Sequence, residues 1–133
     1  MAFGTLKADT LTHSTAGSLA TNFVVEGSAK VWLNLNGTST IATRDSFNVS
    51  GVTDNGTGNY TTSFTTSFSN ANYSHSHTNI TEDGQFGFTS DTSFAQAAGS
   101  VLQRNGYWSG VSGENGASGD SLYFNIQEFG DLA

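Results

Sequence analysis

A histidine pair with one residue between its members is the sharpest candidate for ligand chemistry in the sequence. His75 and His77 flank Ser76 within a stretch that alternates as a β-strand does. Residues two apart on a strand point to the same face, so both imidazoles are expected on one side, together with Tyr73. In a threefold assembly with this face on the axis, three such pairs would offer their nitrogens to one metal ion. The alternative is an exposed polar strand face that holds no ligand.

A second candidate is the aromatic pair Tyr107 and Trp108, which lies beside a stretch rich in Gly, Ser and Asn. Aromatic rings flanked by amide and hydroxyl groups suit both the stacking and the hydrogen bonding of sugar rings. The pair is therefore a candidate platform for glycan contact. Trp108 equally suits a core position or an anchor at a subunit interface, and the sequence pattern leaves these interpretations open.

Recognisable catalytic motifs are absent from the sequence, which contains no GxSxG, HExxH, GxxxxGK[ST] or GxGxxG. Its 11 Asp and Glu residues show no pairing of the kind that a β-sandwich glycosidase needs. It has no Cys to act as a nucleophile or a thiolate ligand. We therefore predict a non-enzymatic protein without a cofactor, apart from a metal ion that His75 and His77 could hold.

The charge of the chain restricts its partners. A formal net charge of −7 and a pI near 4.5 oppose binding to phosphates of nucleic acids and docking on an anionic membrane surface. No stretch has the length and hydropathy of a transmembrane span or a signal peptide. We expect no nucleic-acid partner, no membrane insertion, and synthesis in a cytoplasm without secretion.

Short strands are the elements that must position these residues. Thr (18), Ser (18), Asn (12) and Gly (16) account for nearly half of the 133 residues. Apolar residues recur with a period of two in several stretches that Asn- and Gly-rich turns separate. These stretches are Lys30–Leu35, Asp45–Val49, Tyr60–Phe68, Asn72–Ile80 and Leu122–Ile126. The pattern predicts an all-β fold over residues 28–133, an antiparallel β-sandwich of jelly-roll-like type.

Two segments depart from this pattern. Residues 1–27 alternate only weakly, and Ala16-Gly17-Ser18 interrupts them. We expect an extended N-terminal arm that pairs with an edge strand of its own domain or of another chain, or else a frayed terminus. Ser93–Gln103 has apolar residues at helical spacing but contains Gly99. Two alternatives remain for this segment: a short helix, or a loop followed by a strand.

Several stretches carry a family resemblance. They are Val31–Thr38, Ile41–Ser50, Thr53–Thr61 and Asn70–Tyr73, together with the two ends Gly4–Thr12 and Phe124–Asp131. They resemble a recurring module of virion structural proteins from marine tailed phages, including cyanophages, in which strings such as IRDSFNVSSxTDNGTGxY are typical. The resemblance thins between Thr81 and Asp120. The pair His75 and His77 is likewise similar to the iron-binding HxH of some phage tail spikes and fibres.

This resemblance implies a fibre, spike, knob or decoration protein, a homotrimer made in the host cytoplasm and exposed on the virion surface. Its sandwich would face outward and could contact host-surface glycans. The lead-in segment would attach to other virion proteins of the capsid or tail through Gly4, Thr5, Leu6, Lys7 and Leu11. The alternative function is a carbohydrate-binding β-sandwich adhesin module that acts through Tyr107 and Trp108.

Overall fold

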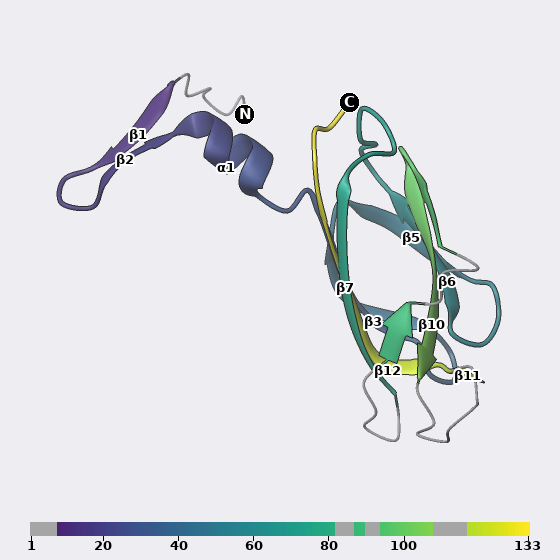
Figure 1. Ribbon diagram of the computed structural model, residues 1–133. Helices are drawn as coiled ribbons and strands as arrows, with labels where there is room; N and C mark the ends of the chain where they lie inside the picture. Colours follow the sequence, from purple (N-terminus) through teal and green to yellow (C-terminus); the bar gives the residue numbers. More distant parts are fainter. Residues whose placement is uncertain (1–7, 82–86, 90–93, 108–116) are drawn as a thin grey trace, which may run out of the picture.

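The computed structural model describes residues 8–81, 87–89, 94–107 and 117–133 (Figure 1). Within these ranges the chain is all-β apart from one short helix, and the strand pairs are antiparallel. The elements are β1 (Thr10–His13), β2 (Gly17–Ala20), α1 (Thr21–Gly27), β3 (Val31–Asn36), β4 (Ala42–Phe47), β5 (Val49–Asp54), β6 (Asn59–Phe64), β7 (Ser74–Thr81), β8 (Gly87–Thr89), β9 (Ala95–Ala97), β10 (Ser100–Tyr107), β11 (Ala117–Ser118) and β12 (Ser121–Phe129).

Two sheets enclose one hydrophobic core (Figure 1). One sheet has the strand order β4-β3-β12-β7; the other has the order β11-β10-β6-β5, with β8 and β9 also pairing with β10. Alternate residues point inward because side chains of a strand alternate between its two faces. The buried apolar residues are Val31, Leu33, Leu35, Tyr60, Phe64, Phe68, Tyr73, Val101, Phe124 and Ile126. The prediction of an all-β, sandwich-like fold with antiparallel sheets is confirmed.

Asn48 marks the point where the chain passes from one sheet to the other. The predicted strand Asp45–Val49 is wrong as a single strand, because it contains the end of β4 and the start of β5. Asn48 has a φ of 57°, in the left-handed region that asparagine tolerates. Its Nδ2 donates to Thr66 O (3.0 Å), and Thr66 N–H donates to Asn48 Oδ1 (2.7 Å). The side chain therefore ties this corner to the loop that follows β6.

The turn between β5 and β6 fits tightly against β10 and against the connection between β11 and β12. Gly58 has a φ of 65°, and its N–H donates to Asp120 Oδ1 (2.8 Å). A Cβ atom on Gly58 would lie 2.6 Å from Gly119 O and 2.7 Å from Asn105 O. Gly56 in the same turn also has a positive φ, of 114°, but nothing lies within 4 Å of an added Cβ. Glycine at 58 is thus required by both conformation and space.

The described part of Ser93–Gln103, for which the sequence left a helix or a strand as alternatives, forms strands. β9 covers Ala95–Ala97, and β10 begins at Ser100 and pairs with both β9 and β6. The helix alternative is wrong. Val101 and Gln103 lie on the inner face, so the period of two continues where the apolar spacing resembled a helix.

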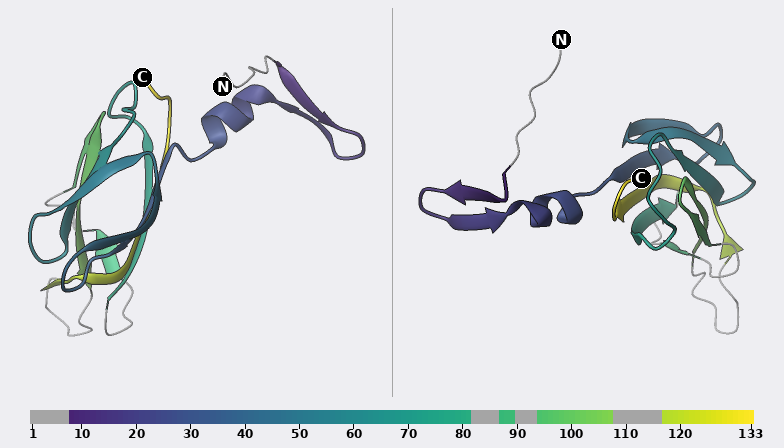
Figure 2. Two further views of the ribbon diagram at one scale, coloured as in Figure 1. Left: turned by 180° about the vertical axis from the view of Figure 1, so that it is seen from behind. Right: turned by 90° about the horizontal axis from the view of Figure 1, so that it is seen from above.

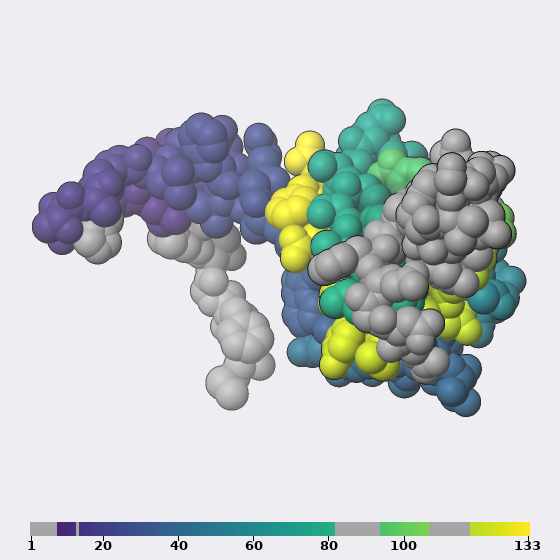
Figure 3. All heavy atoms as spheres, turned by 60° about the horizontal axis from the view of Figure 1, so that its bottom comes forward, coloured from purple at the N-terminus to yellow at the C-terminus, as the bar shows by residue number. Residues whose placement is uncertain are grey.

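The described part of the N-terminal segment, residues 8–27, forms a small unit of its own to one side of the sandwich (Figures 2 and 3). β1 and β2 form a two-stranded hairpin, and α1 follows it directly. This seven-residue helix was not predicted; it has no side-chain cap at its N-terminus and no buried residue. Lys30 Nζ donates to the carbonyls of Val25 and Ser28 near its end. Among the described residues, no helix has the length and hydropathy to span a membrane.

Candidate functional site

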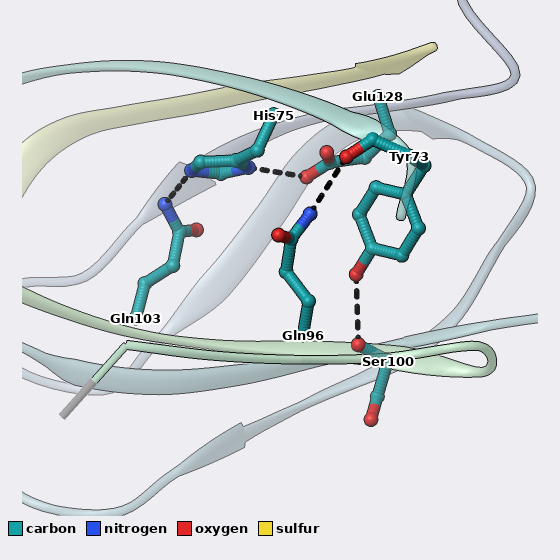
Figure 4. A network of polar contacts seen from close by, with 6 residues as sticks. All are labelled: Tyr73, His75, Gln96, Ser100, Gln103 and Glu128. Carbon is teal, nitrogen blue, oxygen red and sulfur yellow. Dashed lines mark hydrogen bonds and ion pairs between the residues drawn. The ribbon is translucent and has the colours of Figure 1, made fainter. Parts of the chain in front are cut away.

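His75 lies between the two sheets rather than on the surface (Figure 4). Its Nδ1 is 2.7 Å from Glu128 Oε1, and its Nε2 is 2.6 Å from Gln103 Nε2. His75 Nδ1–H donates to the Glu128 carboxyl. The imidazole is therefore held by one residue from each sheet, Glu128 on one side and Gln103 on the other.

Glu128 is the buried acid of this arrangement, with none of its surface exposed. Strand pairing places it beside His75, on the inner face of β12. Its Oε2 has no hydrogen-bond partner among the described residues. Burial raises the pKa of Glu128, and the hydrogen bond and charge of His75 offset only part of that rise. The carboxyl thus binds a proton more readily than an exposed glutamate does.

His77 shares the inner face of β7 with His75, as their spacing predicts. The two rings stack with centroids 5.8 Å apart and planes 11° apart. Burial lowers the pKa of His77, and the neighbouring His75 lowers it further. The interpretation of this strand face as an exposed one is wrong, because Glu128, Gln103 and the core face it.

The metal hypothesis meets a specific obstacle in this geometry. Both ring nitrogens of His75 are engaged inside the chain, so binding an ion through either nitrogen would require the contact at that nitrogen to break. Among the described residues, no group of three or more His, Asp or Glu could hold a metal ion within one chain. A shared metal site at His75 and His77 stays a prediction.

Further polar contacts connect β7 with β10 and β12. Tyr73 donates its hydroxyl proton to Ser100 O (2.9 Å), and Gln96 Nε2 donates to Tyr73 O (3.0 Å) (Figure 4). Deeper along the strands, the amides of Asn79 and Asn105 both donate to Ser121 Oγ, at 3.2 and 3.3 Å. These contacts fix β7 against the opposite sheet.

The other predicted site residues are only partly described. Tyr107 is the last residue of β10, and Trp108 lies outside the described residues. Gly4, Thr5, Leu6 and Lys7 also lie outside them. Leu11 lies in β1 and is exposed. Of the five residues predicted to make the attachment, the structure therefore describes only Leu11, and it leaves the glycan platform untested.

Exposed apolar side chains gather in the segment that contains Leu11. Phe23 is 66% exposed and Val25 is 62% exposed, both in α1. Leu19 and Val24 are exposed as well. The sequence-based prediction placed attachment between Gly4 and Phe23 and did not include Val24 or Val25, although an apolar run in a chain rich in hydroxyl residues was a usable signal. This segment has the exposed apolar surface that marks an interaction site.

Comparison with models of protein families, with characterised proteins and with solved structures gives no match to this chain.

Proposed function

We propose that the protein is a non-enzymatic structural component of a tailed-phage virion. It is a fibre, spike or capsid-decoration protein, a homotrimer that its N-terminal segment, residues 1–27, attaches to capsid or tail proteins. A sandwich of jelly-roll-like type is displayed outward at the virion surface. The observation that carries this proposal is the exposed apolar surface of α1 and the hairpin, beside a domain that already has its own core.

The N-terminal unit has too few internal contacts to be stable by itself. Helices much shorter than about 12 residues are marginal in water, and α1 has seven residues, none of them buried. A single two-stranded hairpin is also marginal. A partner surface that covers Phe23 and Val25 would supply the missing stability. Attachment to a neighbouring chain explains both the apolar residues and their exposure.

Two observations support an assembly role over a catalytic one. The interior titratable pair His75 and Glu128 is engaged in contacts between the sheets. The sequence contains none of the common catalytic motifs. The resemblance of the flanking and central stretches to phage virion modules agrees with this interpretation.

Light scattering of the purified full chain tests the assembly. We expect a trimer for the wild type and for the double variant Phe23→Ser/Val25→Ser, and we expect the double variant to be lost from purified phage particles. Phe47→Ser is the matched control and should stay on the particles, because Phe47 is also a large exposed side chain (54%) but lies on the sandwich. A monomeric wild-type chain would overturn the trimer, and equal retention or equal loss of the two variants would overturn the role of the segment. Absence of the protein from purified phage particles would overturn the virion role.

A further inference from the structure

The outer face of the sheet β4-β3-β12-β7 differs from the rest of the surface. The inward residues of β3 and β12 fill the core, so the intervening residues point outward. This outward surface combines aromatic and amide side chains. We name it the amide face and define it by Trp32, Asn34, Arg44, Phe47, Tyr123, Asn125 and Gln127, of which Phe47 lies beside Trp32 and is 54% exposed.

Strand pairing orders the amide face into rows. Gln127 lies beside Trp32, and Asn125 lies beside Asn34. Cβ atoms of such directly opposed residues lie about 5 Å apart. Tyr123 is four residues from Gln127 along β12, so roughly 13 Å of strand separates the two aromatic ends of the face. A set of amides therefore lies between two aromatic rings.

β7, which pairs with β12 on the side opposite β3, adds hydroxyl groups to these rows. β7 places Ser76 beside Gln127 and Thr78 beside Asn125, and both hydroxyl residues are exposed. Asn125 Nδ2 lies 3.5 Å from Thr78 Oγ1. Each amide can both donate and accept hydrogen bonds, and each hydroxyl can do the same.

Arg44 holds one end of the amide face in place. Its Nη1 donates to Leu35 O (3.0 Å) and to Asn34 Oδ1 (3.3 Å). Its guanidinium carbon lies 4.4 Å from the centroid of the Tyr123 ring. A cation over an aromatic ring restricts the motion of that ring. A ligand that stacks on the remaining exposed part of Tyr123 would thus meet a preorganised group.

The charge of this face points to a neutral ligand. Arg44 and Asp45 carry the only formal charges at the outward positions of the four strands, and they cancel. The whole chain, by contrast, carries −7. Paired donors and acceptors between aromatic rings match the hydroxyl groups and C–H faces of sugars. They match the apolar side of another protein poorly, because amides buried there would lose hydrogen bonds to water.

We propose that the amide face binds a neutral oligosaccharide. This deepens the proposed function by naming a class of partner for the displayed domain, and it places the glycan site on β3 and β12 instead of at Tyr107 and Trp108. The site is complete within one chain and uses no residue of the N-terminal segment. Its success or failure can therefore be separated from that of the assembly proposal.

The test is calorimetric titration of the full chain with hexasaccharides of α-glucan, β-glucan, mannan, galactan and xylan. An oligogalacturonate serves as the charged comparison. We expect saturable binding of at least one neutral hexasaccharide and weaker or no binding of the oligogalacturonate. Trp32→Ala and Gln127→Ala should each weaken that binding about tenfold or more. Trp108→Ala and Phe23→Ser/Val25→Ser should leave it unchanged.

Gln127→Ala keeps the proposal falsifiable even where Trp32→Ala harms folding, because the Gln127 side chain is exposed. Circular dichroism and the unfolding temperature establish which variants are folded. Failure of all the neutral sugars to bind would overturn the proposal. So would loss of binding in Trp108→Ala with retention in Gln127→Ala, or tighter binding of the oligogalacturonate. A change of molecular mass in Gln127→Ala would show instead that this face joins copies of the chain.

Discussion

Replacing His75 with alanine removes the hydrogen-bond donor that the structure gives to the Glu128 carboxylate. The other oxygen of that carboxylate already lacks a partner among the described residues. The variant therefore buries the Glu128 carboxyl with no donor, and it also removes the hydrogen-bond partner of Gln103. Removing one partner of a buried charged pair costs about 3–5 kcal/mol. At about 4 °C per kcal/mol for a domain of this size, the unfolding temperature should fall by about 12–20 °C.

The matched variant is His75→Ala/Glu128→Gln, which keeps the shape of residue 128 but removes its charge. Because the charge causes most of the expected loss, the double variant should be more stable than His75→Ala at pH 7 by about 2 kcal/mol. Urea unfolding followed by circular dichroism measures the two free energies. A double variant that is no more stable than His75→Ala would refute the reasoning that the unpaired charge is the main cost.

The same pair of variants gives a pH dependence with a defined sign. The pKa of Glu128 is raised in the folded state above its ordinary value of 4.5. A raised pKa means that folding favours the protonated acid, so this group destabilises the fold as pH rises through the folded pKa. The stability gap between the two variants should therefore widen as pH rises through the folded pKa of Glu128 and close as pH falls toward 4.5. A gap that does not change with pH would contradict the assignment to Glu128.

Three further substitutions have expected outcomes that urea unfolding can measure. The pKa of His77 lies below its ordinary value of 6.5. The wild type should therefore lose stability relative to His77→Gln as pH falls below 6.5. Parallel plots of unfolding free energy against pH for the two proteins would contradict this. Gly58→Ala should lower the free energy of unfolding by about 3 kcal/mol and Gly56→Ala by about 1 kcal/mol, because only the first adds a steric clash to the strain of a positive φ. Equal losses would refute the claim that residue 58 has no room for a Cβ atom. Asn48→Ala should lower the free energy of unfolding by about 2–3 kcal/mol, because it removes two hydrogen bonds and places alanine at a φ of 57°. A loss below about 0.5 kcal/mol would show that the corner does not need the Asn48 side chain.

Much of the sandwich was predictable because its strands alternate strictly. In β3, the buried Val31, Leu33 and Leu35 show the period of two that half-buried strands require. The corner at Asn48 was not predictable in the same way, since Phe47 and Val49 continue the alternation across it. α1 escaped prediction because it is short and its Val24-Val25 pair disfavours helices.

The inward orientation of His75 and His77 was within reach of the sequence. The period of two that places Phe124 and Ile126 in the core also places Glu128 there. A buried carboxylate needs a donor, and a histidine on a neighbouring strand is a suitable one. What spacing could not show is that β7 lies beside β12, because pairing between strands about 50 residues apart depends on the whole topology.

The position of β3 has a mechanical consequence. β3 follows the N-terminal segment directly and is held along its length by β4 on one side and β12 on the other. A pulling force that enters through that segment runs along β3 and loads both ladders in shear. Many hydrogen bonds then resist together, instead of breaking one after another as an edge strand peels away. If the displayed face of β3 and β12 also holds the ligand, the load path from anchor to ligand stays within one sheet.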